Sequence, residues 1–159
     1  MTFEVRPVRD EDRDWIRDLI EERWADEFVV GHGVVSRPAE LDGFVAMEGV
    51  DVVGLATYRI EGAACEIVTI DALVEGRGVG STLVEAVHER AHRAGCARLW
   101  LVTTNDNERA QAFYDKLGFR VVAVREGAVD EARKLKPSIP LIGAGGIPIT
   151  DELELERRL

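Results

Sequence analysis

A glycine-rich segment, Gly76-Arg77-Gly78-Val79-Gly80-Ser81, lies between a run typical of a β-strand and a run typical of an α-helix. Glycines let the backbone approach a ligand closely, the first N–H groups of a helix have no partner within it, and the helix dipole favours negative charge at that end. The segment therefore predicts a binding site for a phosphate or pyrophosphate group.

Two common nucleotide-binding patterns fit this segment poorly. A dinucleotide-binding loop has a third glycine where Ser81 stands, and Asp106 lies only approximately where its acidic ribose ligand belongs. The strands before the loop also resemble hairpins rather than a strand–helix–strand unit. A triphosphate-binding loop ends in Gly-Lys-Ser/Thr, and no lysine occurs between Glu61 and Lys116. The triphosphate pattern is excluded, while a dinucleotide-dependent oxidoreductase stays as a rival.

A second group of residues reinforces the glycine segment and comprises Asn107, Ala110, Phe113, Tyr114, Gly118 and Phe119. With both groups, residues 66–119 resemble the GNAT-type N-acetyltransferases. The loop of that family, Arg/Gln-x-x-Gly-x-Gly/Ala, corresponds to residues 75–80. Its second signature, Asn-x-x-Ala-x-x-Phe-Tyr-x-x-x-Gly-Phe, corresponds to residues 107–119. Glu75 departs from the pattern, which predicts weaker electrostatic attraction there.

The resemblance implies a cofactor, acetyl-CoA, that acts as co-substrate, and no metal. Its pyrophosphate is expected at the glycine segment, with Ile70 beside the pantetheine arm and the backbone N–H near Val68 facing the oxyanion. Asn107 caps its helix, contacts the cofactor, or does both. The implied cofactor-binding residues are Val68, Ile70, Gly76, Arg77, Gly78, Val79, Gly80, Ser81, Asn107 and Phe113.

Acetyl transfer to an amine requires three events: the amine loses a proton, the tetrahedral oxyanion is stabilised, and the departing thiolate gains a proton. By resemblance the thiolate is protonated by Tyr114, although this residue also lies on an apolar stripe and could be a core tyrosine. The general base is Glu66 acting through water, with Asp71 as the rival and a structural role open for both. Strict alternation along the strand predicts that these two carboxylates point to opposite faces.

The acyl acceptor is expected to be a primary amine of a small molecule or a protein, bound by the first helix, the next loop and the tail. Aromatic and acidic residues suit an ammonium group, although Trp15 and Trp24 also have the spacing of core residues. The other candidates are Glu22, Asp26, Glu27 and His32. A non-catalytic acetyl-CoA-binding sensor or regulatory module is the alternative function.

The elements that would hold these residues follow from hydrophobic periodicity. Strands are predicted at 3–8, 44–47, 52–58, 65–73, 98–103, 119–124 and 152–156, the first of them at a sheet edge. Helices are predicted at 12–24, 79–91 and 107–117, and residues 28–38 are a loop or a broken helix. Together these elements predict an α+β (α/β three-layer) fold with a mixed, mostly antiparallel sheet of six to seven strands flanked by helices.

The C-terminal segment 136–150 contains three prolines and three glycines but also many isoleucines. It predicts a packed irregular loop, which covers the core or meets a second subunit in a homodimer. Residues 1–159 are interpreted as a single acetyltransferase domain, with 136–159 as its ordered C-terminal loop and strand.

Charge and composition narrow the partners and the compartment. The 30 acidic residues against 20 basic ones give a net charge of −10, which disfavours nucleic acid and anionic membranes. Neither a signal peptide nor a run of about 20 apolar residues is present. Cys65 and Cys96 are too few for a disulfide framework, so a cytoplasmic location with reduced thiols is expected.

Overall fold

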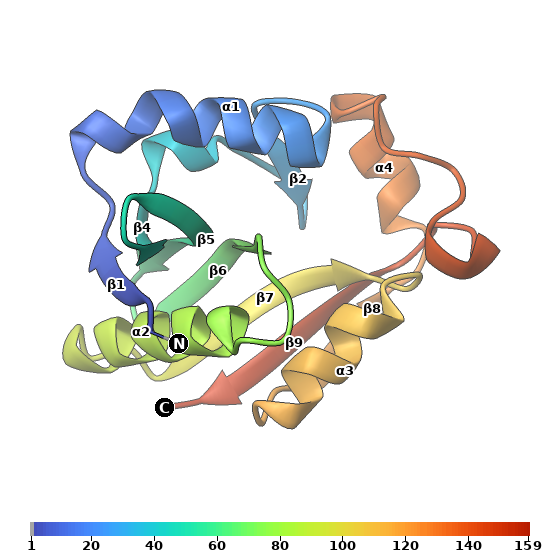
Figure 1. Ribbon diagram of the computed structural model, residues 1–159. Helices are drawn as coiled ribbons and strands as arrows, with labels where there is room; N and C mark the ends of the chain where they lie inside the picture. Colours follow the sequence, from blue (N-terminus) through green and yellow to red (C-terminus); the bar gives the residue numbers. More distant parts are fainter. Residues whose placement is uncertain (1) are drawn as a thin grey trace.

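The chain forms a seven-stranded sheet in the order β1-β4-β5-β6-β7-β9-β8 and a separate two-stranded hairpin, β2-β3. The computed structural model describes residues 2–159 (Figure 1). All neighbouring strands of the sheet are antiparallel except β6 and β7, which are parallel. The predicted mixed, mostly antiparallel sheet is thus confirmed. Its strands are β1 (Glu4–Pro7), β4 (Asp42–Glu48), β5 (Asp51–Glu61), β6 (Ala64–Ala72), β7 (Arg98–Thr104), β8 (Arg120–Arg125) and β9 (Glu152–Arg158).

Helices cover both faces of the sheet and make three layers. In Figure 1, α1 and α4 lie on one side, and α2 and α3 on the other. Ile20 of α1 packs in a cluster with Leu55, whereas Leu83 of α2 packs in a cluster with Ala56, the next residue of the same strand. Successive residues of β5 therefore face opposite layers, as period-two alternation requires. The helices are α1 (Arg13–Trp24), α2 (Val79–Arg93), α3 (Glu108–Lys116) and α4 (Ala128–Leu135).

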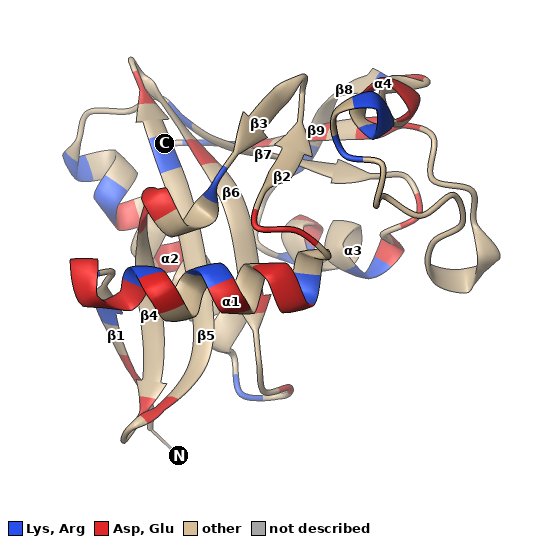
Figure 2. Cartoon of the chain, turned by 90° about the horizontal axis from the view of Figure 1, so that it is seen from above, with Lys and Arg blue, Asp and Glu red and all other residues tan. Residues whose placement is uncertain are grey.

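Helix α1 buries Ile16 and Ile20, which are one turn apart on its inner face. The predicted core position of Trp24 is wrong, because its side chain is 38% exposed at the end of the helix. Ala25, with a φ of 71°, ends the helix in the left-handed conformation and turns the chain toward the hairpin. Acidic and basic residues alternate along α1 (Figure 2), which carries Asp14, Asp18, Glu21 and Glu22 together with Arg13, Arg17 and Arg23.

The segment after α1 is a β-hairpin, so the predicted loop or broken helix over residues 28–38 is wrong. Strands β2 (Val29–Gly31) and β3 (Val34–Ser36) pair antiparallel around a two-residue turn. His32 and Gly33, with φ values of 42° and 79°, form that turn. Both central residues of a type I′ turn need positive φ. The β-branched pairs on either side of Gly-His-Gly were the available signal for a hairpin.

The region between β8 and β9 contains a helix that the periodicity did not predict. Helix α4 starts after Gly127, buries Val129 and Ala132, and leads into the proline-rich segment. That segment is irregular, as expected, but only partly packed, since Leu141 is 70% exposed whereas Ile149 is buried.

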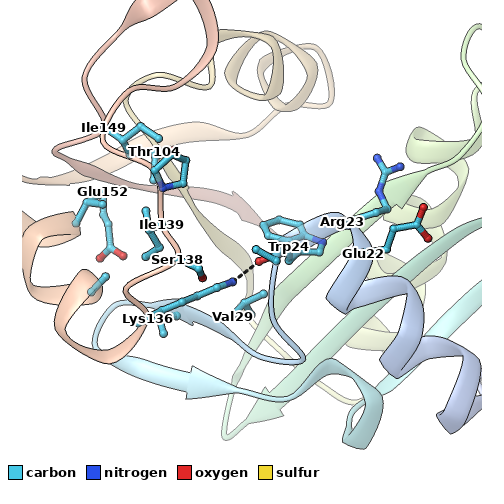
Figure 3. Close-up of a pocket in the computed structure, with 15 residues that line it drawn as sticks. Glu22, Arg23, Trp24, Val29, Thr104, Lys136, Ser138, Ile139, Ile149 and Glu152 are labelled. Atoms are coloured by element: carbon cyan, nitrogen blue, oxygen red, sulfur yellow. Dashed lines mark hydrogen bonds between the residues drawn. The ribbon is translucent and has the colours of Figure 1, made fainter.

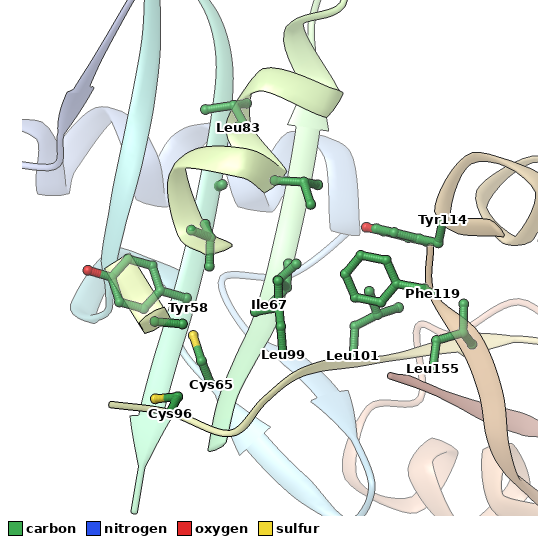
Figure 4. Close-up of a cluster of buried hydrophobic side chains, with 14 of the residues drawn as sticks. Tyr58, Cys65, Ile67, Leu83, Cys96, Leu99, Leu101, Tyr114, Phe119 and Leu155 are labelled. Atoms are coloured by element: carbon green, nitrogen blue, oxygen red, sulfur yellow. The ribbon is translucent and has the colours of Figure 1, made fainter. Parts of the chain in front are cut away.

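Strand β9 lies inside the sheet, between β7 and β8, rather than at its margin. Its leucines, Leu153 and Leu155, join the core on the α2 and α3 side, which Figure 4 shows in part. Its glutamates therefore face the other layer, beside the hairpin and α4.

Both cysteines are free and buried, as predicted. Cys65 and Cys96 lie in the core on the α2 side (Figure 4), where burial raises the pKa of the Cys65 thiol to about 12. Among residues 2–159, no helix has the length and apolar character to cross a membrane.

Candidate active site

The glycine segment has the geometry of an anion-binding turn. Gly76 and Gly78 have φ values of 73° and 72°, and Gly78 is the N-cap of the 15-residue helix α2. The first N–H groups of that helix therefore point into the space before it without helical partners. Gly80 packs closely against α3, and a Cβ atom there would make a tight 3.1 Å contact with Cζ of Phe113.

A cavity of about 460 Å³ opens at this turn, between the end of β6, the start of α2 and the side of α3. Most of the predicted cofactor residues line it together: Ile70, Gly76, Gly78, Val79, Gly80, Ser81, Asn107 and Phe113, with Tyr114. Arg77 is an exception, since its guanidinium lies 2.9 Å from Glu48 Oε2 and does not form part of the wall. Asn107 caps α3 by accepting a 3.1 Å hydrogen bond from Ala110 N while also lining the cavity.

The unexpected carboxylate of Glu75 has a cationic partner. Arg109 donates a 2.9 Å hydrogen bond to Glu75 Oε1, and both residues line the cavity. Both side chains are exposed, so the pair contributes little to stability, on the order of 0–1 kcal/mol. Arg109, which sequence reasoning missed, supplies the positive charge beside the glycine turn. No periodicity marked it, because it comes from a different helix.

Tyr114 combines a buried ring with a wall position in the cavity. Its ring packs edge-on against Phe113 and Phe119, and the residue is 8% exposed. Burial, reinforced by the negative charge of Asp71, raises the pKa of the Tyr114 hydroxyl well above its ordinary value. Figure 4 shows the ring of Tyr114 beside that of Phe119. The tyrosine is therefore a core residue that also lines the cavity, and its raised pKa keeps the hydroxyl protonated.

A β-bulge interrupts β6 at Val68. Thr57 of β5 is opposite Thr69, whereas Tyr58 is opposite Ile67, so Val68 has no register partner. On the other side of β6, pairing with β7 ends at Glu66 and Trp100. The two parallel strands separate beyond that point (Figure 1), and a cavity of about 160 Å³ lies between them. Val68 thus has backbone groups beside a cavity instead of a neighbouring strand.

Glu66 lines this small cavity, close to the bulge. Its Oε2 lies 2.9 Å from His32 Nε2 at the tip of the hairpin, and its Oε1 lies 3.3 Å from Arg59. Burial raises the pKa of Glu66, and the neighbouring His32 and Arg59 oppose that rise. A carboxylate with a raised pKa is better suited to accept a proton than an ordinary exposed one. His32, one of the candidates for binding the acceptor, therefore contacts the candidate base.

The prediction that Asp71 and Glu66 point to opposite faces is wrong. The bulge at Val68 adds one residue to β6, so Glu66 and Asp71, although an odd number of residues apart, both face the α1 layer. Asp71 is buried and accepts hydrogen bonds from Arg23 Nε (2.9 Å) and Trp24 Nε1 (3.2 Å). Burial raises the pKa of Asp71, although the hydrogen bonds from these two donors act to lower it. Asp71 is not part of the wall of the small cavity or of the cavity at the glycine turn. Its hydrogen bonds to Arg23 and Trp24 hold the end of α1 in place.

A third cavity, of about 520 Å³, lies beyond the bulge between α1, the hairpin, α4 and the tail (Figure 3). It shares Arg23 with the cavity of about 460 Å³ at the glycine turn, which we call the cofactor cavity after the residues predicted to line it. It shares Trp24, Thr104 and Glu152 with the small cavity. Asn107 lines both the small cavity and the cofactor cavity. The three spaces therefore form a path of adjoining cavities that share wall residues, and Val68 lines the small one.

Only part of the predicted acceptor set lines that path. Glu22 and Trp24 are in its wall, whereas Asp26 bonds to Ser138 and Glu27 lies 4.0 Å from Arg37. Trp15 is half-buried and donates to Asp12 through Nε1. The residues that sequence reasoning missed are Glu152 and Lys136, together with the apolar wall residues of α4 and the tail.

The seven-stranded sheet and the glycine turn are consistent with the family that the sequence resembles. The acetyltransferase (GNAT) family profile matches residues 5–119, and the chain belongs to that family. The dinucleotide-dependent oxidoreductase is thereby ruled out as an interpretation.

Particular relatives agree with this assignment. The Bacillus subtilis protein YdhI is 42% identical over 140 residues, which cover 87% of each chain. Among solved structures, the IAA acetyltransferase from Bacillus cereus superposes with a TM-score of 0.73 at 20% identity, over 99% of this chain and 100% of its own. A GNAT family acetyltransferase from Elizabethkingia anophelis with acetyl-CoA bound gives 0.71 at 18%, over 99% and 98%. At such identities these two structures establish the fold.

Proposed function

We propose that the protein is an N-acyltransferase that moves an acetyl group from acetyl-CoA directly to a primary amine of a small molecule or a protein. The observation that carries this proposal is the path of adjoining cavities, with the glycine turn at one end, Val68 in the small cavity and a mostly apolar pocket that contains Glu152 at the other end. Such a path lets both substrates reach the same backbone bulge at once. Family membership supports the cofactor.

The cofactor cavity suits coenzyme A in both its charge and its shape. The pyrophosphate binds the N–H groups at the start of α2, where the helix dipole favours anions, and Arg109 adds a nearby positive charge. The pantetheine arm then runs past Ile70 toward Val68, beside the strand edge that β7 leaves unpaired. The thioester carbonyl is placed at the bulge, where the Val68 N–H stabilises the oxyanion.

Proton movement follows from the two groups on either side of this carbonyl. Glu66, through a water molecule, removes one proton from the ammonium form of the amine, and the neutral nitrogen then attacks the thioester carbon. The nitrogen loses its second proton to solvent as the tetrahedral intermediate collapses, and Glu66 later releases its own proton to solvent. The tetrahedral intermediate expels the thiolate of CoA, which takes the proton of the Tyr114 hydroxyl. The products are the N-acetylated amine and free CoA, and Tyr114 recovers its proton from solvent.

Direct transfer is favoured over an acyl-enzyme because neither thiol is near the path. Cys65 and Cys96 are both buried in the core and line none of the three cavities. The raised pKa of Cys65, about 12, also keeps that thiol protonated and poorly nucleophilic.

The test is release of CoA thiol from acetyl-CoA that depends on an added amine, compared between the wild type and Tyr114→Phe. General-acid catalysis contributes about 10²–10⁴-fold, so this variant should lose about 100-fold or more in kcat. Its dissociation constant for acetyl-CoA should be unchanged.

Tyr58→Phe is the matched control. Tyr58 is the chain's other tyrosine, buried against Phe44 and remote from the cofactor cavity. The control should retain wild-type turnover. Tight acetyl-CoA binding with no turnover across a wide amine panel would instead identify a non-catalytic sensor or regulatory module.

A further inference from the structure

Three glutamates of β9 share one face of the sheet, and they differ in their partners. Glu154 binds Arg98 at 2.9 Å and Arg125 at 2.7 Å, and Glu156 binds Arg98 at 3.1 Å. Within residues 2–159, Glu152 has no cationic side chain within 4.0 Å, although it is only 4% exposed. Its carboxylate accepts a single backbone donor, His32 N, at 3.2 Å.

Two basic residues that line cavities together with Glu152 are engaged elsewhere. Arg125 is its cross-strand neighbour in β8, but the guanidinium of Arg125 turns to Glu154. Lys136 reaches away from it toward the end of α1 (Figure 3), where Nζ donates to Trp24 O at 2.7 Å and to Phe28 O at 2.9 Å. The charge of Lys136 therefore stabilises the carbonyls at the end of α1 instead of a carboxylate.

A buried carboxylate without a counter-ion is costly to keep, so buried charges in proteins are normally paired. Glu152 borders all three spaces on the acceptor side: the large cavity, the small cavity with Val68, and a groove beside α4. A cation that binds Glu152 from solvent would remove the free-energy cost of this unpaired buried charge. An ammonium group bound to Glu152 would lie in the cavity that also holds Glu66 and Val68.

The large cavity beside Glu152 suits a hydrocarbon group. Its volume of about 520 Å³ is within the usual range for small-ligand sites, about 300–1,000 Å³. Most of its wall is apolar and includes Trp24, Val29, Val129, Ala132, Ile139 and Ile149. Because Lys136 is bound to carbonyls and Arg23 to Asp71, neither basic group is free to bind a substrate carboxylate.

We infer that Glu152 binds the ammonium group of the acceptor and that the large cavity holds an apolar chain or ring attached to it. The acceptor class is a small apolar primary amine without a carboxylate, and this inference rests on the proposed function. The bound ammonium loses one proton to Glu66 through water, the neutral nitrogen attacks the thioester, and the second proton leaves to solvent as the amide forms.

The decisive experiment measures binding and turnover separately. Calorimetry with the CoA-loaded protein uses 2-phenylethylamine as the probe, with phenylalanine (the same amine plus a carboxylate) and 2-phenylethanol (no ammonium) as matched compounds. The amine should bind at least about tenfold more tightly than either matched compound. Failure of the wild type to bind it, or equal binding of phenylalanine, overturns the inference.

Glu152→Gln keeps an acceptor for His32 N–H but removes the charge. It should weaken binding of 2-phenylethylamine about 30-fold or more and leave acetyl-CoA binding unchanged. It should also raise the Tm of the unliganded protein by about 2–4 °C, because an unpaired buried charge is lost. A carboxylate with a merely structural role would give a lower Tm and unchanged amine binding.

Glu154→Gln is the control from the same strand, since it removes the same charge from a residue that arginines already neutralise. It should lower stability and leave amine binding unchanged. If amines bind as expected but are never acetylated, the proposed function fails and the binding inference stands. If only short polar amines or peptides are acetylated, the function stands and the inference fails.

Discussion

The cofactor cavity at the glycine turn and the large cavity beside Glu152, which we propose as the acceptor cavity, are built in different ways. The first is made largely of backbone from one continuous strand–turn–helix unit, with glycines at 76, 78 and 80 and one neighbouring helix. The second is assembled from side chains of α1, the hairpin, α4, the tail and β9, which are far apart in sequence. A site made of backbone depends on a short motif, whereas a site made of distant side chains can change its preference without changing the fold.

The largest effect should come from disturbing the backbone-built cavity. Gly80→Val places a branched side chain where even a Cβ lies 3.1 Å from Phe113 Cζ and also blocks the helix start. The dissociation constant for acetyl-CoA, measured by calorimetry, should rise about 100-fold or more, equivalent to about 2.7 kcal/mol. Gly95→Ala is the control, because Gly95, with a φ of 79°, lies at the other end of α2 and outside the wall of the cofactor cavity. It should cost stability only.

The next effect is expected at Glu66, between the two cavities. Because burial raises its pKa, the wild-type kcat/KM should fall as the pH drops through that raised value, where the carboxyl becomes protonated. Glu66→Gln should lower kcat/KM about 100-fold at higher pH and abolish that fall. A pH–rate profile of Asp71→Asn separates the rival base. If it is Asp71→Asn that abolishes the fall, the base has been misassigned.

A smaller effect is expected at Lys136, which lines the acceptor cavity and donates hydrogen bonds to carbonyl oxygens at and just after the end of α1. Lys136→Met keeps the chain length but removes the bonds to Trp24 O and Phe28 O. The KM for the amine should rise about tenfold, with a lower Tm, since hydrogen bonds to charged groups contribute about 1.5–3 kcal/mol each. Lys134→Met is the control, because Lys134 is exposed and its Nζ bonds to Glu131 in the preceding turn of α4. Equal effects of both variants would remove Lys136 from the account.

The smallest effect should appear at Glu75. Glu75→Gln removes a carboxylate from the cofactor cavity and frees Arg109 to meet the pyrophosphate. The affinity for acetyl-CoA should improve about two- to fivefold, within the range of exposed ion pairs, and the gain should shrink at high salt. Weaker binding in this variant would show that Glu75 assists the cofactor.

The sequence predicted the backbone-built part of the molecule well because its signals are local. The glycine turn, the two helices beside it, and the strands from β4 to β8 all follow from periodicity and turn residues within short windows. The predicted alternation of side chains between the two faces along β6 was wrong, because the residue types do not reveal the bulge at Val68. Glu152 was interpreted only as part of an alternating strand, since its lack of a counter-ion depends on where Arg125 and Lys136 lie in space.

The account's central claim is that both cavities are filled at the same time, so that the acetyl group passes directly from acetyl-CoA to an amine at Val68. Initial-rate kinetics with acetyl-CoA and 2-phenylethylamine varied together, with the N-acetylated product identified by mass spectrometry, tests this most directly. Intersecting double-reciprocal lines, which indicate a ternary complex, are the predicted result. Parallel lines, the pattern of a covalent acyl-enzyme, or the absence of any N-acetylated product would contradict it.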